Sequence, residues 1–398
     1  MDYEKESLKK HAEWKGKIET LPRVQVDSNE KLALAYTPGV AAPCLAIHDD
    51  VNLSYELTRR WNTVAVITDG TAVLGLGDIG PEAGMPVMEG KCALFKTFGN
   101  VDAFPICIKS KDTQDIIKTI SLISGSFGGI NLEDISAPRC FEIETTLKRE
   151  LGIPVFHDDQ HGTAIIVAAA LLNALKLVKK DIKKIKVVVN GAGAAGIAIS
   201  KFLMDLGVKD LIAVDRKGIL VEGDTEFNPA QQELAKITNR KKLKGTLADA
   251  MKGADVFVGV SVANCVTKDM VRSMAEKSIL FTCANPLPEI SVEDAKEAGA
   301  YIHGTGSSEY PNQINNVLVF PGLFRGALDA RATTVNHEMM EAAARGIAEC
   351  IPENELAVDH ILPYAWDQKV HDTVAKYVEE AAIKTGVSKL HKNTKGRK

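Results

Sequence analysis

The sequence predicts an α/β protein of two domains, with C-terminal helices that return to the first domain. Three observations support this fold class. The chain has 398 residues, more than one ordinary domain contains. Short apolar runs typical of buried strands alternate with helical stretches in two separate series. A lysine-rich segment at residues 179–186 follows a long apolar helix and separates the two series.

The first series predicts an N-terminal domain over residues 1–162. A helix is expected at residues 4–17. Each strand of this domain is followed by a helix or by an acidic turn, so we expect a sheet whose strand ends meet at one edge. The predicted strands are residues 63–68, 101–108, 130–132 and 155–156, and further helices are predicted through Lys91 and Leu94, at 112–124 and at 140–151.

The second series predicts a parallel-sheet domain over residues 163–320. It opens with the apolar helix at 163–178, and its continuous apolar strands are typical of a sheet covered on both faces. These strands are predicted at 186–190, 211–214, 255–260 and 279–282. The C-terminal segment, residues 321–398, is helical and amphipathic, with helices at 327–330, 336–350 and 371–384. It is too short of apolar residues for a core of its own, and we expect it to pack on the first domain.

Composition excludes several function classes. Apolar residues make up 45% and charged residues 25%, with a net charge of −4, which offers no broad basic face for nucleic acid. The seven cysteines are odd in number and lack Cys-x-x-Cys spacing, so neither a disulfide framework nor a thiolate zinc site is expected. The N-terminus lacks a signal peptide, and no apolar run is long enough to span a bilayer. We therefore expect a cytoplasmic protein without membrane partners.

A dinucleotide site is predicted where the strand at 186–190 meets a glycine-rich loop. Gly191 permits a tight turn, Gly193 allows the backbone to approach a pyrophosphate, and Gly196 allows close helix packing. The alanines of the loop share this site, and the following helix directs its positive N-terminus at the phosphates. The loop comprises Gly191, Ala192, Gly193, Ala194, Ala195 and Gly196.

The acid at the end of the next strand favours NAD. Asp215 lies nineteen residues after Gly196, where a carboxylate accepts the ribose 2′-hydroxyl and repels a 2′-phosphate. Arg216 and Lys217 follow directly, so NADP stays possible if Asp215 turns away.

Two acidic pairs follow strands of the first domain and suggest a metal site. Glu133 and Asp134 come after one strand, and Asp158 and Asp159 after another. If the strand ends converge, three of these oxygen ligands suit Mg²⁺ or Mn²⁺. Adjacent acids are also common in solvated turns and helix caps, and the residues alone leave both interpretations open.

The motifs as a set resemble malic enzymes of the small prokaryotic type. The resemblance covers roughly residues 20–380 and rests on eight motifs in the family's order, at residues 36–40, 68–78, 90–91, 131–134, 157–163, 190–196, 284–286 and 315–322. It implies oxidative decarboxylation of L-malate to pyruvate and CO₂, with NAD or NADP as cofactor, a required Mg²⁺ or Mn²⁺, and a homodimer.

The resemblance also implies a role for each matching residue. Glu133, Asp134 and Asp159 match the metal ligands. Lys91 matches the general base, Tyr36 the general acid, and Asp158 the acid that partners the lysine. Asn285 and Asn316 match residues that contact malate, and Asn315 lies beside them. Asn285 also borders the cofactor.

One position departs from the family pattern. Larger relatives carry an arginine that grips a substrate carboxylate where this chain has Ala72 after Thr71. Either another cation supplies that contact, with Arg325 and Lys96 as candidates, or backbone N–H groups do. Two other functions stay open at this stage: a metal-free enzyme resembling amino-acid dehydrogenases, and a non-catalytic NAD-binding protein.

Overall fold

The first sheet has four parallel strands in the order β2-β1-β3-β4. We describe a computed structural model of residues 3–73 and 75–390. The strands are β1 (Thr63–Thr68), β2 (Asp102–Cys107), β3 (Gly129–Leu132) and β4 (Val155–His157), and the accompanying helices are α5 (Pro81–Gly99), α6 (Thr113–Ile123) and α7 (Arg139–Glu150). All four predicted strands are present, and the carboxyl ends of β3 and β4 lie side by side because these strands pair in parallel.

The second sheet has six strands in the order β10-β9-β8-β5-β6-β7, and only β7 is antiparallel to its neighbour. The strands are β5 (Lys186–Asn190), β6 (Asp210–Asp215), β7 (Gly218–Ile219), β8 (Val256–Gly259), β9 (Ile279–Thr282) and β10 (Ile302–Thr305). The sequence did not predict β7 or β10, because one has two residues and the other contains His303 and Gly304. The helices that connect the strands of the second sheet are α9 (Ala194–Asp205), α10 (Pro229–Ile237), α11 (Leu247–Met251), α12 (Lys268–Arg272) and α13 (Val292–Glu297).

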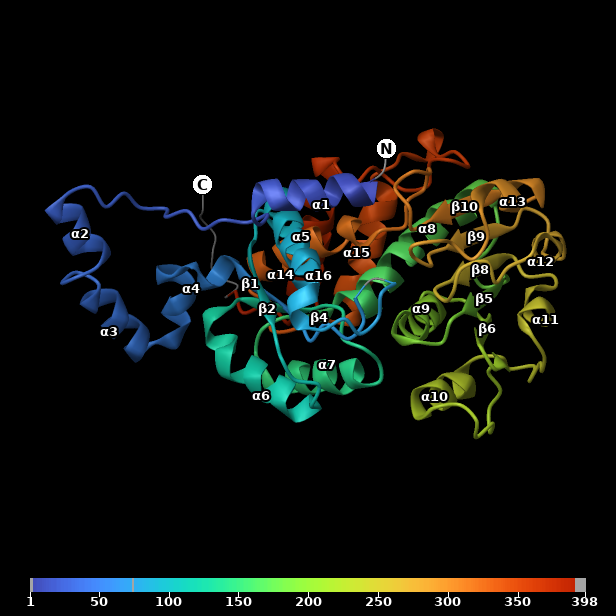
Figure 1. Cartoon of the computed structure of the whole chain (residues 1–398), viewed down its shortest axis with the longest axis horizontal. Helices are drawn as coiled ribbons and strands as arrows, with labels where there is room; N and C mark the ends of the chain where they lie inside the picture. The colour runs from blue at the N-terminus through green and yellow to red at the C-terminus, as the bar shows by residue number, and fades with distance from the viewer. Residues whose placement is uncertain (1–2, 74, 391–398) are drawn as a thin grey trace.

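The apolar helix α8 (Thr163–Val178) lies between the two sheets (Figure 1). With the turn before it, it is long and apolar enough to cross a membrane by length and composition. However, 72% of its most apolar 18-residue stretch is buried inside the protein, against α9 and α15 among others. The apolar sequence of α8 is therefore explained by its place in the core.

The C-terminal helices return to the first sheet, as the sequence predicts. Helix α14 packs on α5, where the Phe95 ring lies 4.7 Å from Phe320 and 5.2 Å from Phe324. The elements are η5 (Asn316–Leu318), α14 (Phe320–Asp329), α15 (His337–Glu349), η6 (Glu353–Glu355) and α16 (Gln368–Lys384). The domain boundaries after residues 162 and 320 stay predictions, and residues 391–398 of the third segment lie outside the described part of the chain.

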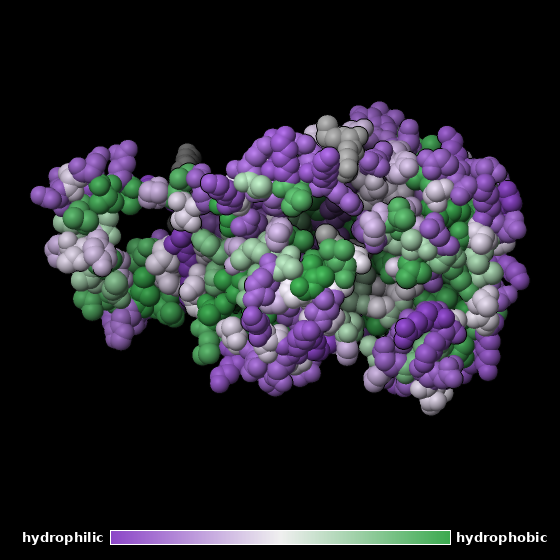
Figure 2. All heavy atoms as spheres, in the orientation of Figure 1, coloured by the Kyte–Doolittle hydropathy of each residue, from purple (hydrophilic) through white to green (hydrophobic). Residues whose placement is uncertain are grey.

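An N-terminal arm extends away from the body of the molecule (Figure 1, left). Its helices α2 (Asn29–Ala35) and α3 (Ala41–Asp49) contain no buried residue. The other elements of this region are α1 (Tyr3–Trp14), η1 (Val51–Leu53), α4 (Ser54–Leu57) and η2 (Arg59–Asn62). Hydrophobic spheres gather on the arm in Figure 2, and the exposed apolar residues there are Leu21, Val24, Val26, Leu32, Leu34, Tyr36, Leu45 and Val51.

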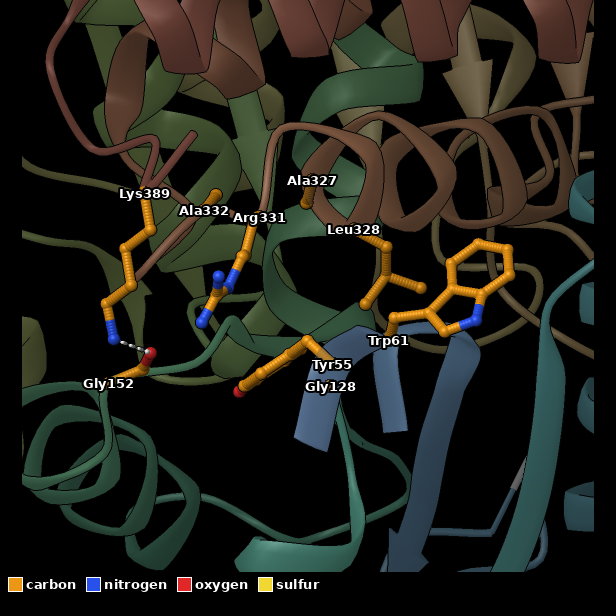
Figure 3. Close-up of a pocket in the computed structure, with 9 residues that line it drawn as sticks. All are labelled: Tyr55, Trp61, Gly128, Gly152, Ala327, Leu328, Arg331, Ala332 and Lys389. Atoms are coloured by element: carbon orange, nitrogen blue, oxygen red, sulfur yellow. Dashed lines mark hydrogen bonds between the residues drawn. The ribbon is translucent and has the colours of Figure 1, made fainter. Parts of the chain in front are cut away.

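A small cavity lies near the amino ends of the first sheet (Figure 3). Gly128 and Gly152, which precede β3 and β4, line it beside Tyr55 and Arg331, and the Lys389 ammonium donates to the Gly152 carbonyl. The cavity measures about 10 Å³, enough for a single water. This cavity is therefore too small for a dinucleotide or an organic acid.

Candidate active site

Three carboxylates meet at the carboxyl edge of the first sheet. Glu133 and Asp134 follow β3, and Asp159 lies in the turn after β4; one oxygen from each lies within 4.8 Å of the others. The backbone N–H of Asp134 donates to Oδ2 of Asp159 at 2.8 Å, which ties the two strand ends together. Asp134 has a φ of 54°, in the left-handed region that non-glycine residues rarely adopt. The structure thus brings together the three predicted metal ligands.

Lys91 lies beside this cluster on α5. Its Nζ is 2.6 Å from Oδ2 of Asp158 and 3.0 Å from Oε1 of Glu133, and it lies 4.1 Å above the centre of the Phe320 ring. Burial alone lowers the pKa of Lys91, but the two carboxylates outweigh burial and raise the pKa above its usual value. Lys91 is therefore a charged, buried ammonium in the absence of other cations.

Asp158 is the centre of a second set of contacts. Besides Lys91, its Oδ2 accepts the side-chain amide of Asn316 at 3.0 Å. A Cβ at Gly162 would lie only 2.0 Å from Oδ1 of Asp158, so the glycine makes room for this carboxylate. Asn315 caps η5 by accepting the backbone N–H of Val317. The structure therefore joins Asp158 and Asn316 directly, and Asn315 is the residue before Asn316.

The charges of the cluster do not balance. Burial raises the pKa of Glu133, and the nearby carboxylates of Asp159, Asp158 and Asp134 raise it further against the opposing effect of Lys91. In the described part of the chain, Lys91 pairs with Glu133 and Asp158, and the ring of His157 lies 3.8 Å from Asp159. Oxygen ligands with excess negative charge fit a hard divalent cation, so the donor set agrees with Mg²⁺ or Mn²⁺.

Tyr36 does not join these residues. It caps α2 on the N-terminal arm, and it is 67% exposed. Within residues 3–73 and 75–390, its side chain makes no hydrogen bond to Lys91 or to the acidic cluster. The predicted general acid and general base are thus separated within a single chain.

The dinucleotide loop has the geometry that the sequence predicts. Gly191 has a φ of 108°, and a Cβ there would lie 2.6 Å from the Val260 carbonyl. At Gly196 a Cβ would lie 1.7 Å from the Gly191 carbonyl, so the helix can approach the strand only without a side chain. Gly193 caps α9, which begins at Ala194 and Ala195. A cavity of about 500 Å³ opens over this loop and is also lined by Asp215, Arg216, Ser261 and Cys265.

Asp215 is held in place by Gln231, a residue that the sequence alone gave no reason to connect with the cofactor. The side-chain amide of Gln231 donates to Oδ2 of Asp215 at 3.0 Å and to the carbonyl of Ala192 at 3.1 Å. Gln231 also completes a capping box with Asn228 at the start of α10. The capping pattern is the one sequence signal for this residue, and it predicts a helix start rather than a cofactor contact.

A second missed residue, Glu289, links the loops after β8 and β9. Its buried carboxylate accepts the backbone N–H groups of Ser261 and Ala284 at 3.0 and 3.2 Å. Asn285, next to Ala284, is exposed, and a Cβ at Gly75 would lie 2.6 Å from its carbonyl. The structure thus brings Asn285 up to Gly75, which lies between β1 and α5 in the first domain.

Neither of the two candidates for the missing arginine contact, Arg325 and Lys96, lies at the carboxyl edge of the first sheet. Arg325 binds Asp329 and also Asn62, which directly precedes β1. Lys96 binds Asp102, the first residue of β2. Both therefore lie at the amino edge, opposite the acids, because their helices carry them there. The guanidinium beside Thr71 is that of Arg139, which lies 2.9 Å from its hydroxyl and pairs with Asp69.

The fold and the two sites define a class of protein. A parallel sheet with a dinucleotide loop, joined to an acidic cluster around a buried lysine, is the arrangement of a pyridine-nucleotide oxidoreductase assisted by a divalent cation.

Comparisons with known proteins identify the family. Residues 15–148 match the malic enzyme N-terminal domain, and residues 160–383 match the malic enzyme NAD-binding domain. The chain is 54% identical to a bifunctional malic/malolactic enzyme of Bacillus subtilis, over 98% of this chain and 95% of the relative. It is 55% identical to a NAD-dependent malic enzyme of Geobacillus stearothermophilus, over 94% of this chain and 78% of that one.

Solved structures agree. The NAD-dependent malic enzyme of Thermotoga maritima superposes with a TM-score of 0.91 at 50% identity, covering 94% of this chain and 98% of that one. The malic enzyme of Pyrococcus horikoshii gives a TM-score of 0.92 at 45% identity, with 97% and 92% covered.

The chain belongs to the malic enzyme family. It is an NAD(P)-dependent enzyme that oxidatively decarboxylates malate to pyruvate and CO₂. The alternatives of a metal-free amino-acid dehydrogenase and of a non-catalytic NAD-binding protein are thereby wrong.

Proposed function

We propose that malate is oxidised and decarboxylated at the cluster around Lys91, with Glu133, Asp134 and Asp159 as the metal ligands. The observation that carries this assignment is the meeting of those three carboxylates, within 4.8 Å, beside the buried Lys91 ammonium. A divalent cation held there would supply positive charge next to the C2 oxygen of malate. That charge would stabilise the oxygen when its proton leaves, and again when loss of CO₂ turns the C2 carbonyl into an enolate.

Lys91 is the general base for the C2 hydroxyl. A divalent cation held by Glu133, Asp134 and Asp159 would repel the Lys91 ammonium and favour the neutral amine. Because Nζ is fixed by Asp158 and packed on Phe320, that amine can then receive the proton without moving. Asp158 stabilises the ammonium that results, and Asn316 holds Asp158 in turn. Asn285 lies at the junction of the two sheets, where it can contact both malate and the nicotinamide as hydride leaves C2, while Asn315 supports Asn316 from the adjoining turn.

The cofactor binds over the loop 191–196, with NAD preferred to NADP. Support comes from Asp215, whose carboxylate is oriented toward the loop by the amide of Gln231. A carboxylate fixed there accepts ribose hydroxyls and repels a 2′-phosphate.

The working unit is a homodimer in which Tyr36 protonates C3 of the product in the partner's site. The arm that carries Tyr36 buries none of the residues of α2 and α3 against its own chain, although it is rich in apolar side chains. An apolar surface of this kind is typical of a subunit interface.

Since all seven cysteines are free thiols, we infer the reducing cytoplasm as the location.

One assay tests the assignment. Malate should reduce NAD⁺ in the presence of Mn²⁺, with pyruvate and CO₂ formed in equal amounts, and EDTA should abolish the reaction. Lys91→Ala should lower kcat by at least about 10²-fold while the Kd for NADH, measured by fluorescence, stays unchanged. Full activity in EDTA, or normal turnover by Lys91→Ala, would reject the proposal.

A further inference from the structure

The acids at the candidate metal site lie in an unusual turn. Asp158 and Asp159 belong to a five-residue π-helical turn, Asp158–Gly162, between β4 and α8. A π-helical turn is rare because its backbone is wound more widely than an α-helix, and such turns are frequently found at functional sites. The turn therefore needs support from the rest of the structure.

Glu144 of α7 provides that support from beneath. It is 5% exposed, and it contacts the chain on both sides of the two aspartates. Its Oε1 accepts the backbone N–H of His157 at 3.1 Å, and its Oε2 lies 2.8 Å from Nε2 of His161 and 3.4 Å from the side-chain amide of Gln160. One carboxylate thus holds the residues before and after Asp158 and Asp159.

The same carboxylate is charged. Its Oε1 lies 2.8 Å from the ammonium of Lys148, one turn later on α7. Although burial raises the pKa of Glu144, His161 and Lys148 outweigh burial and hold the pKa below its usual range. Hydrogen bonds to a charged acceptor are stronger than neutral ones, so the turn is firmly attached to α7.

We propose that Glu144 is the positioning residue of the metal site: by fixing the turn, it sets the direction of the Asp159 carboxylate and hence the affinity for the divalent cation. The link is short, because Asp159 lies between two residues that Glu144 holds, and Asp159 Oδ2 accepts the Asp134 N–H. This inference rests on the proposed metal site.

Outer residues that orient metal ligands change metal affinity by about 10- to 100-fold when they are removed. A residue that only stabilises the fold acts differently. Its loss lowers the melting temperature, but the protein that stays folded binds the metal as before. Metal affinity at a temperature well below unfolding separates the two roles.

The test uses the full chain and Mn²⁺ as the probe. Free Mn²⁺ is counted by electron paramagnetic resonance during titration of the wild type, Glu144→Gln and a control, Glu142→Gln. Glutamine keeps the size of Glu144 but removes its charge. Glu142 lies on the same helix and is exposed, and within the described residues its side chain accepts only the amide of Gln114. We expect the Kd for Mn²⁺ to rise about 10- to 100-fold in Glu144→Gln and to stay unchanged in Glu142→Gln.

Two further variants keep the test decisive if Glu144→Gln does not fold. His161→Gln removes the contact at Oε2, and Lys148→Met removes the ion pair at Oε1 without touching the turn. Each should raise the Kd for Mn²⁺ above that of the wild type. If Glu144→Gln does fold, each should raise the Kd less than Glu144→Gln does, and His161→Gln should add little to it in the double variant.

The outcomes are distinguishable. If the wild type binds no Mn²⁺, the proposed metal site fails, and this inference fails with it. If the wild type binds Mn²⁺ but Glu144→Gln, or His161→Gln in its place, binds it with the same Kd, the metal site stands and the positioning role of Glu144 is overturned. A lower melting temperature with an unchanged Kd likewise overturns the positioning role, because it is the behaviour of a residue that only stabilises the fold.

Discussion

The ammonium of Lys91 lies 2.6 Å from Oδ2 of Asp158, and the same oxygen accepts the amide of Asn316 at 3.0 Å. This shared oxygen joins helix α5, the turn after β4 and the segment before α14. The proposed base is thus placed by three parts of the chain that are far apart in sequence.

Asp158→Asn should impair catalysis more than binding. The asparagine keeps its shape, but it no longer neutralises the ammonium formed when Lys91 receives a proton. We expect kcat to fall by about 10²-fold or more, with the Kd for NADH unchanged. Asp115→Asn, on the exposed start of α6, serves as control. An Asp158→Asn enzyme with wild-type kcat would contradict the role given to this carboxylate.

Gly162→Ala should act on the same carboxylate by crowding. The added methyl would lie 2.0 Å from Oδ1 of Asp158, so the side chain or the turn must shift. Overpacking of this kind costs about 1–3 kcal/mol of unfolding free energy, and we expect kcat to fall together with the midpoint of urea unfolding. At Gly125 a Cβ has no heavy atom within 4 Å, so Gly125→Ala should leave kcat at the wild-type value.

Subunit mixing tests the proposed exchange of Tyr36. Tyr36→Phe and Lys91→Ala should each be nearly inactive alone. If each active site combines Lys91 of one subunit with Tyr36 of the other, a mixed dimer regains one intact site of its two. Random re-association at equal amounts should therefore restore about a quarter of wild-type kcat. No recovery, with mixed dimers shown by mass spectrometry, would mean that the tyrosine serves its own chain.

Gln231→Leu should relax the choice of cofactor. Without the amide, Asp215 is free to turn away, and Arg216, which lines the same cavity, can then meet a 2′-phosphate. We expect the KM for NAD⁺ to rise and the NAD⁺-to-NADP⁺ ratio of kcat/KM to fall by about 10-fold or more, since one lost hydrogen bond to a charged group costs about 1.5–3 kcal/mol. Gln232→Leu is the matched control, because in the part of the chain that the structure describes the Gln232 side chain donates only to the Phe227 carbonyl.

His303 predicts a loss of stability in mild acid. Burial lowers the pKa of His303 from 6.5 to about 4. Above pH 6.5 the ring is neutral in both states and contributes nothing; between 6.5 and 4 the unfolded chain binds the proton first, so unfolding becomes easier as the pH falls. The loss reaches about 3 kcal/mol near pH 4. Urea unfolding of His303→Gln should show a shallower pH dependence than the wild type, and an unchanged dependence would contradict the role given to this ring.

Local sequence patterns were sufficient for much of the fold. The strand at residues 63–68 and the helix at 163–178 have the predicted bounds, because continuous apolar runs of those lengths have one stable environment each. The dinucleotide loop was predictable for a similar reason. Its glycines are required by contacts with the adjoining strand and helix, such as the approach of Gly196 to the Gly191 carbonyl.

Supporting residues such as Gln231, Glu289 and Glu144 could not be predicted. Each is an ordinary polar residue in its own segment, and each acquires its role only from a partner elsewhere in the chain: Asp215, Ser261 and His161 respectively. The prediction that Arg325 or Lys96 replaces the family arginine was wrong for the same reason. A cation's charge can be read from sequence, but the edge of the sheet that it reaches cannot.

By itself, the sequence determined the two series of strands and helices, the loop for the dinucleotide and the two acidic pairs that follow strands of the first domain, because these depend on short-range periodicity and on residue chemistry. The tertiary structure decided which of those groups meet. It placed Glu133, Asp134 and Asp159 around one point, since parallel strands end at a common edge. It also placed Tyr36 on an arm whose helices α2 and α3 bury no residue against the rest of the described chain.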